Sequence, residues 1–214
     1  MDKHVMALIE LRPWEEAPPA PQMFGAAGRE HMEKYGSKAE HFAWIGWKNH
    51  KHSTNNPYAQ FQDEYTLEQI QESRMIHEPL TKLQCSPTSD GAAAVIVASE
   101  SYVDEHDLWD QAVEIAGQSM VTDLSSSFDE TADCISIVGF DMSKEAARQA
   151  YEEAGVSADE IDVCELHDCF SANELITYEA LGFAEEGHGH ELVEAEATTY
   201  GGDGPVVNLS LIHI

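Results

Sequence analysis

Three side chains that exchange protons or donate hydrogen bonds follow one another at His167, Asp168 and Cys169. A short run of β-favouring residues precedes them, and Ser171 and Glu174 stand at the S-x-x-E spacing of a helix capping box. The pattern therefore predicts a strand, a sharp turn and the start of a helix. Unpaired backbone N–H groups and the helix dipole favour negative charge at such a position. A cysteine there can be shifted toward its thiolate, the reactive form of this side chain.

A purely structural interpretation stays open at this point, because a buried cysteine and a capping aspartate are ordinary at a strand-to-helix junction. The four cysteines form no C-x-x-C pair, so the spacing typical of structural zinc ligands is missing. They are Cys85, Cys134, Cys164 and Cys169. His50 and His52 have no carboxylate or cysteine at ligand spacing. We therefore predict no metal site.

Three strands are predicted in the part of the chain before the turn at His167, and a sheet of such strands would hold that turn in place. The segment 92–98 consists of small apolar residues, which is typical of a strand buried on both faces. Further strands are expected at 112–117 and at 161–164, the second of which leads into His167.

Helices alternate with these strands. One is predicted over 144–154, with Asp141 or Ser143 as its cap and Gly155 at its end, and 135–140 is read as the end of a loop. The helix after the turn is expected to stop at Gly182, in a left-handed conformation. Strand, helix, strand and helix joined by short links indicate a layered α/β fold with right-handed crossovers.

The first third of the chain is predicted to be helical with one extended connector over 12–21, which holds four of the eight prolines. Helices are expected from Pro21 to just before Gly36, and over 38–48 with its aromatic residues in the core. The polar segment 49–61 is expected to form turns. A short helix is expected over 66–76, with its first residue as the cap.

Composition restricts the possible partners of the chain. Its 214 residues, of which 43% are hydrophobic, suffice for one domain or parts of two, and no apolar run is long enough to span a bilayer. With 11 Lys and Arg against 40 Asp and Glu, the formal charge is −29, which opposes nucleic-acid binding. Few unpatterned cysteines agree with a reducing compartment, so we expect a cytoplasmic protein.

The charge density also predicts adaptation to high salt. Like charges repel one another at this density, and the repulsion is screened where the Debye length falls to about 3 Å near 1 M salt. A heavily solvated surface without such adaptation is the alternative.

Four segments together resemble the thiolase part of sterol carrier protein x, a branch of the thiolase superfamily that acts on acyl-CoA. They are Ala20-Pro-Gln-Met-Phe-Gly to Tyr35-Gly, Trp47-Lys-Asn-His to Phe61, Ser86-Pro-Thr-Ser-Asp-Gly-Ala-Ala-Ala, and His167-Asp168-Cys169-Phe170 with the residues up to Leu181. The last replaces the Asn-Glu-Ala-Phe motif of other thiolases. The resemblance runs from about the first residues to Asn208.

This resemblance implies a partial thiolase-like layered α/β fold. Residues 1–80 would belong to the loop domain, 81–106 to the last strand region of the N-terminal half, and 107–208 to part of the C-terminal half. Residues 209–214 depart from the family pattern, and we expect them to be a non-native tail. The chain would then be a thiolase fragment truncated at both ends.

The resemblance also implies roles for individual residues. His167 would donate a hydrogen bond into an oxyanion hole, Cys169 would act as the acid/base thiol, and Asp168 would orient the turn. Cys85 would be structural. The family's acylated cysteine and its Gly-His-Pro histidine are not in this sequence, and His213 lacks both the preceding Gly and the following Pro.

We therefore expect a 3-ketoacyl-CoA thiolase, or acetyl-CoA C-acyltransferase of lipid metabolism and fatty acid β-oxidation, whose isolated 214-residue piece is inactive. Its partners would be acyl-CoA and CoA, as substrates rather than cofactors, with no cofactor besides them. The full-length form would be a homo-oligomer, and in a eukaryote it would be peroxisomal. A non-catalytic lipid or acyl-CoA carrier and a structural piece of an oligomer interface remain as alternatives.

Overall fold

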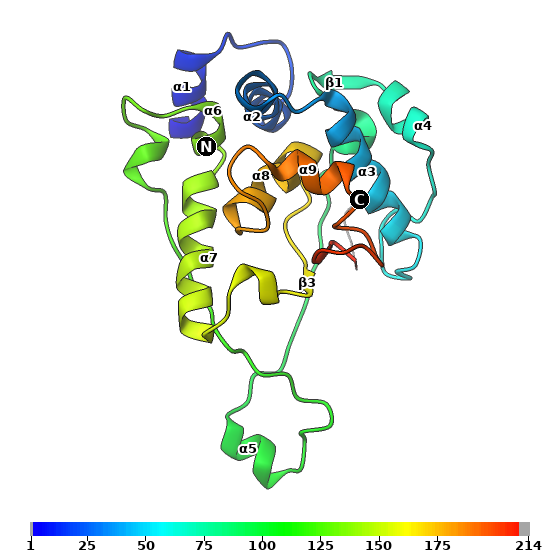
Figure 1. Cartoon of the computed structure of the whole chain (residues 1–214), viewed down its shortest axis with the longest axis vertical. Helices are drawn as coiled ribbons and strands as arrows, with labels where there is room; N and C mark the ends of the chain where they lie inside the picture. The colour runs from blue at the N-terminus through cyan, green and yellow to red at the C-terminus, as the bar shows by residue number, and fades with distance from the viewer. Residues whose placement is uncertain (1, 210–214) are drawn as a thin grey trace.

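A computed structural model describes residues 2–209 and shows a helical body from which one extended arm projects (Figure 1). The helices are α1 (Asp2–Leu11), α2 (Pro19–Tyr35), α3 (Ala39–Ser53), α4 (Leu67–Glu72), α5 (Glu100–Glu105), α6 (Cys134–Ile137), α7 (Phe140–Ala154), α8 (Ser171–Ala180) and α9 (Gly189–Glu194). The strands are β1 (Met75–His77), β2 (Leu80–Thr81), β3 (Val163–Cys164) and β4 (Val206–Val207). Within residues 2–209, every helix is too short or too polar to cross a bilayer.

Helix α8 lies at the centre of the body, because its two sides face two separate cores. Leu175 and Tyr178 are fully buried in the first core, together with Phe42 of α3 and Val207 of β4. Ile176 belongs to the second core, which it shares with α1, α2 and α6. Eight of the ten residues of α8 are buried, as expected for a helix enclosed on both sides. The start of α8 is therefore held firmly in the fold.

The predicted helices in the first third are confirmed, with different ends. Helix α2 ends where Gly36 takes a left-handed conformation (φ 78°), and its N–H bonds the carbonyl of Met32 at 3.1 Å. Thr66 caps helix α4, as predicted, and exchanges capping hydrogen bonds of 3.2 and 2.8 Å with Gln69. The helix stops at Glu72, earlier than predicted, and the chain continues into β1.

Helix α3 is longer than predicted. The sequence suggests turns after Lys48, but the helix continues to Ser53 and buries Asn49 and His52. Buried polar groups need hydrogen-bond partners, and these come from α8 and from the chain after β4. The partners lie far away in sequence, so local composition gave no sign of them.

Helix α6 lies where the sequence suggested a loop end, so the loop prediction for 135–140 is wrong. The N–H of Ser136 donates to the carboxylate of Asp133 at 2.7 Å, and the N–H of Asp133 donates back to the Ser136 hydroxyl at 2.9 Å. This reciprocal pair caps a helix of four residues that packs into the second core.

Helix α7 starts earlier than predicted. Its N-cap is Gly139, with φ 99°, rather than Asp141 or Ser143. Gly155 ends the helix, as the sequence predicts, and takes a left-handed conformation.

The predicted strands at 92–98 and 112–117 are wrong. The segment 92–98 and residues 112–116 lie in the arm, defined here as residues 87–116, which carries α5 near its far end (Figure 1). Ile96 is 97% exposed and Val113 is 91% exposed. A strand buried on both faces needs neighbouring strands and covering helices, and within residues 2–209 no strand pairs with either segment. Their β-favouring composition alone cannot form a sheet.

The remaining sheet structure is small. Strands β3 and β4 pair in parallel, with Val163 opposite Val206, and β1 pairs antiparallel with β2. The predicted strand before His167 is therefore confirmed in shorter form, and α8 follows it on the way to β4.

Candidate active site

The turn of residues 165–170 joins the end of β3 to the start of α8, as the sequence predicts. Its capping differs from the prediction, because Phe170 is the N-cap and Ser171 is already helical. The Glu174 carboxylate is fully buried and contacts the ammonium of Lys48 instead of returning to the helix start. A buried charge requires a partner of opposite sign, which explains why Glu174 turns into the core.

The two predicted site residues occupy the same turn in different surroundings. His167 is exposed, and its carbonyl accepts a hydrogen bond from Asn173 Nδ2 at 2.8 Å. Cys169 is 8% exposed, and its carbonyl accepts from the N–H of Ser86 at 2.9 Å. The next side chain, Phe170, stacks on the ring of Phe24 with centroids 4.9 Å apart. The imidazole is thus open to a ligand, while the thiol lies just beneath the surface.

The thiol of Cys169 is held in its protonated form. Burial raises its pKa to about 12, and the negative charge of Asp168 acts in the same direction. Backbone N–H groups at the helix start oppose this shift but are outweighed. The expectation that the helix start shifts Cys169 toward its thiolate is therefore wrong, because removal of water and a neighbouring carboxylate dominate over the helix dipole.

Cys85 lies next to the turn, where it forms an isolated antiparallel bridge with Phe170. Its thiol donates to the carbonyl of Thr81 at 3.3 Å, and burial raises its pKa to about 12. Both observations support the structural role expected for Cys85.

Sequence reasoning missed the buried polar residues behind the turn. Lys48 is fully buried, and burial lowers its pKa while the charge of Glu174 opposes that shift. The sequence hints at this buried polar group only by placing a lysine and an asparagine, at 48–49, directly after the aromatic residues of the predicted helix. Asn208 is also fully buried, in a left-handed conformation with φ 57°.

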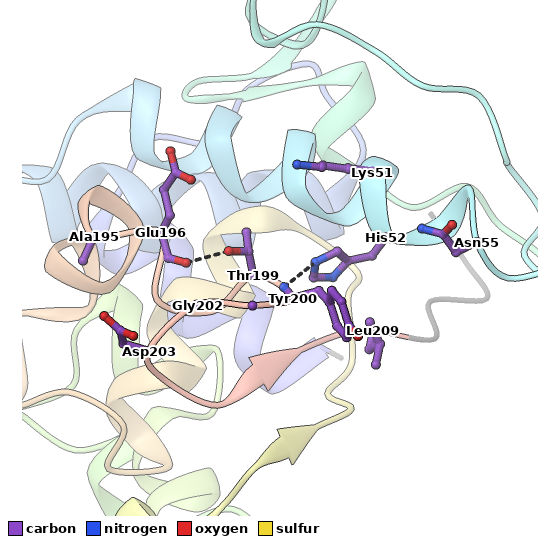
Figure 2. Close-up of a pocket in the computed structure, with 11 residues that line it drawn as sticks. Lys51, His52, Asn55, Ala195, Glu196, Thr199, Tyr200, Gly202, Asp203 and Leu209 are labelled. Carbon is purple, nitrogen blue, oxygen red and sulfur yellow. Dashed lines mark hydrogen bonds between the residues drawn. The ribbon is translucent and has the colours of Figure 1, made fainter.

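A cavity of about 810 Å³ lies elsewhere, between α3 and the chain before β4 (Figure 2). His52 forms part of the wall of this cavity. Its Nε2 accepts a hydrogen bond from the N–H of Tyr200 at 3.2 Å, and its Nδ1 donates one to the carbonyl of Asn208 at 3.2 Å. Burial lowers the pKa of His52, and the charge of Lys48 adds to the effect. Residues 165–170 are not part of this lining.

A second hollow, of about 540 Å³, borders the start of the turn between β3 and α7. Its lining is largely apolar and includes Cys164 and Leu166 on one side and Ala147 and Ala150 on the other. In the part of the chain that the structure describes, His, Cys, Asp and Glu side chains form no group of three or more that could hold a metal ion.

The comparisons with known proteins show what this fold and turn are similar to. Residues 125–209, which include β3, the turn, α8 and β4, match the family described as thiolase C-terminal domain-like. The fold resembles the solved structure of an "Ltp2-ChsH2(DUF35) aldolase" with a TM-score of 0.72 and 26% identity, over 88% of this chain and 49% of that chain. The partial thiolase-like α/β fold predicted from the sequence is confirmed.

More particular relatives extend the match across the chain. Sterol carrier protein 2 of Bos taurus is 61% identical over 202 residues, which are 94% of this chain and 37% of that protein. The acetyl-CoA acetyltransferase of Methanothermobacter thermautotrophicus is 37% identical over 186 residues, 87% of this chain and 47% of that protein. The resemblance to the thiolase part of a sterol carrier protein is confirmed, and the chain spans less than half the length of these two relatives.

Proposed function

We propose that this chain is part of an acyltransferase of the thiolase type, which cleaves a 3-ketoacyl-CoA with free CoA or runs the reverse Claisen condensation. One observation carries the proposal. An exposed imidazole and a buried thiol, His167 and Cys169, share one turn between β3 and α8. That turn lies within the segment that matches the thiolase family.

The roles of the two side chains follow from their surroundings. An imidazole N–H of His167 would stabilise the negative charge that develops on a thioester oxygen. Cys169, protonated at neutral pH, would give its proton to the carbanion that leaves when the carbon–carbon bond breaks. The resulting thiolate would then take the proton of the CoA thiol, which attacks the acyl thioester. This second transfer restores the Cys169 thiol, so protons balance over the cycle.

The acylated cysteine of the family would come from another part of the parent protein, because no position in this sequence matches it. We therefore propose that the 214-residue chain alone does not turn over 3-ketoacyl-CoA. Residues 1–80 would form part of the loop domain, and 107–208 part of the C-terminal half.

The test is thiolysis of a 3-ketoacyl-CoA by the intact gene product and by this chain. We expect turnover only in the intact protein, with Cys169→Ala and His167→Ala each lowering kcat by a factor on the order of 100 or more. Cys134→Ala is the matched control, since this thiol lies in the second core. Turnover by the isolated chain that is lost in Cys169→Ala would contradict the proposed inactivity, and an unimpaired Cys169→Ala parent would contradict the proposed role.

A second candidate is a non-catalytic carrier of lipid or acyl-CoA. It is favoured by the name of the mammalian relative, a sterol carrier protein, and by the apolar hollow beside β3. Titration with acyl-CoA and with a sterol separates the two candidates, because the thiolase proposal requires binding that depends on the CoA moiety. We also propose that the full-length form is a homo-oligomer, which gel filtration would test.

A further inference from the structure

We propose that Lys48 of α3, together with Glu174 and Asn208, is a positioning residue for the turn that carries His167 and Cys169. This inference rests on the proposed function, because it assigns a role to residues that hold the proposed site. It concerns a contact between two segments that are 126 residues apart in the chain.

The ammonium of Lys48 is fully buried, and all of its hydrogen-bond donors have acceptors. It donates to the Glu174 carboxylate, to the carbonyl of Val207 at 3.0 Å and to the hydroxyl of Tyr178 at 3.3 Å. A lysine has three N–H donors, and each has an acceptor here. The side chain thus joins α3 to both α8 and β4.

The carboxylate of Glu174 holds the start of α8. Besides Lys48 and Tyr178, it accepts hydrogen bonds at Oε2 from Asn49 Nδ2 at 2.6 Å and from Asn208 Nδ2 at 2.8 Å. Glu174 lies one helical turn after the N-cap, so these bonds determine the rotation and position of the first turn of α8. The position of the thiol-bearing turn depends on that first turn.

Asn208 holds the other end of the same turn. Its Oδ1 accepts from the N–H of Leu166 at 2.9 Å, and its own N–H donates to the carbonyl of Cys164 at 2.8 Å. The side-chain amide of Asn208 thus links the chain just after β3 to the carboxylate of Glu174. Leu166, which it holds, immediately precedes His167. Both ends of the 165–170 turn are therefore tied to the ion pair of Lys48.

A role in global stability alone would make a different prediction. If the ion pair only stabilises the body, its loss promotes unfolding that exposes all buried thiols together. If it positions the turn, its loss promotes local opening that exposes Cys169 more than a thiol elsewhere. Cys134 is a suitable reference, because it is buried in the second core and burial raises its pKa to about 12, as for Cys169.

The experiment measures the alkylation rate of each cysteine in the full 214-residue chain with iodoacetamide, by peptide mass spectrometry. The variants are Lys48→Met, Glu174→Gln and the double variant Lys48→Met/Glu174→Gln. Lys51→Met is the matched control, because Lys51 lies on the same helix but is exposed over the ring of Trp47. Hydrogen exchange of the Leu166 amide gives a second readout of the turn.

We expect Lys48→Met and Glu174→Gln to raise the Cys169 rate about tenfold relative to Cys134, and to speed exchange at Leu166. Lys51→Met should leave the ratio unchanged. The double variant removes both buried charges and keeps an amide oxygen for Asn49 and Asn208, so resistance to urea should recover while the Cys169 ratio stays high. The proposal would be overturned if the ratio of the Cys169 rate to the Cys134 rate did not change in the single variants. It would also be overturned if the double variant restored both the resistance to urea and the low ratio. If Lys48→Met does not fold, Glu174→Gln and the double variant still test the proposal. None of these rates involves acyl-CoA, so failure of the proposed function leaves this test intact.

Discussion

Replacement of Glu179 by glutamine should destabilise the fold strongly, because its carboxylate closes a second buried network. Glu179 is 5% exposed, and His31, its partner from α2, is fully buried. Oε1 accepts from His31 Nε2 at 2.8 Å and from the N–H of Gly189 at 2.8 Å. Oε2 accepts from the N–H of Gly187 at 2.9 Å. Two oxygens therefore serve three donors, one from α2 and two from the chain around the start of α9.

The expected magnitude follows from the geometry of the side-chain amide. Glutamine offers one acceptor oxygen, so in either orientation its NH₂ faces a buried backbone N–H, that of Gly187 or that of Gly189. An unsatisfied buried donor costs about 1–3 kcal/mol, and loss of the negative charge weakens the bonds that remain by roughly 1 kcal/mol. We expect Glu179→Gln to lower the free energy of unfolding by about 2–4 kcal/mol, a large share of a typical domain's stability.

Urea unfolding followed by circular dichroism measures this loss directly. Glu186→Gln is the control, because this carboxylate is exposed although it accepts from the hydroxyl of Tyr35 at 2.9 Å. The control should change stability by at most about 0.5 kcal/mol. A Glu179→Gln variant as stable as the control would show that the buried carboxylate does not hold this network.

Three further outcomes are expected. The pKa of Cys169 is raised to about 12 in the folded state from the ordinary 9.0, so the folded protein keeps a proton that the unfolded chain releases. Stability contributed by this thiol should be complete below pH 9 and fall as the pH approaches 12, which urea titrations of the unaltered protein and of Cys169→Ala at several pH values would show as a difference between the two. Leu175→Ala should cost about 2–5 kcal/mol, because it removes a fully buried side chain from the first core; urea unfolding measures the loss. Removing salt should lower the thermal midpoint in calorimetry, since the formal charge of −29 is then unscreened; an unchanged midpoint would contradict adaptation to high salt.

Local sequence signals were sufficient to predict those features of the structure that depend on residues close together in the chain. Helices end at or near Gly36, Gly155 and Gly182, as predicted, and each of these glycines takes a positive φ. The order of strand, turn and helix around His167 is likewise local, because propensity and a break in pattern mark it. These features depend on a few consecutive residues, and the sequence contains them completely.

Contacts between distant segments decided the rest. The spacing of Ser171 and Glu174 predicted a capping box, but a buried carboxylate is more stable beside Lys48, which the spacing cannot reveal. The segment 92–98 has the composition of a buried strand, yet a strand forms only where partners supply hydrogen bonds and cover its faces. The pKa of Cys169 likewise depends on burial and on the charge beside it. The sequence by itself determined which residues lie in the turn, and the tertiary structure decided their exposure, their charge state and what holds them in place.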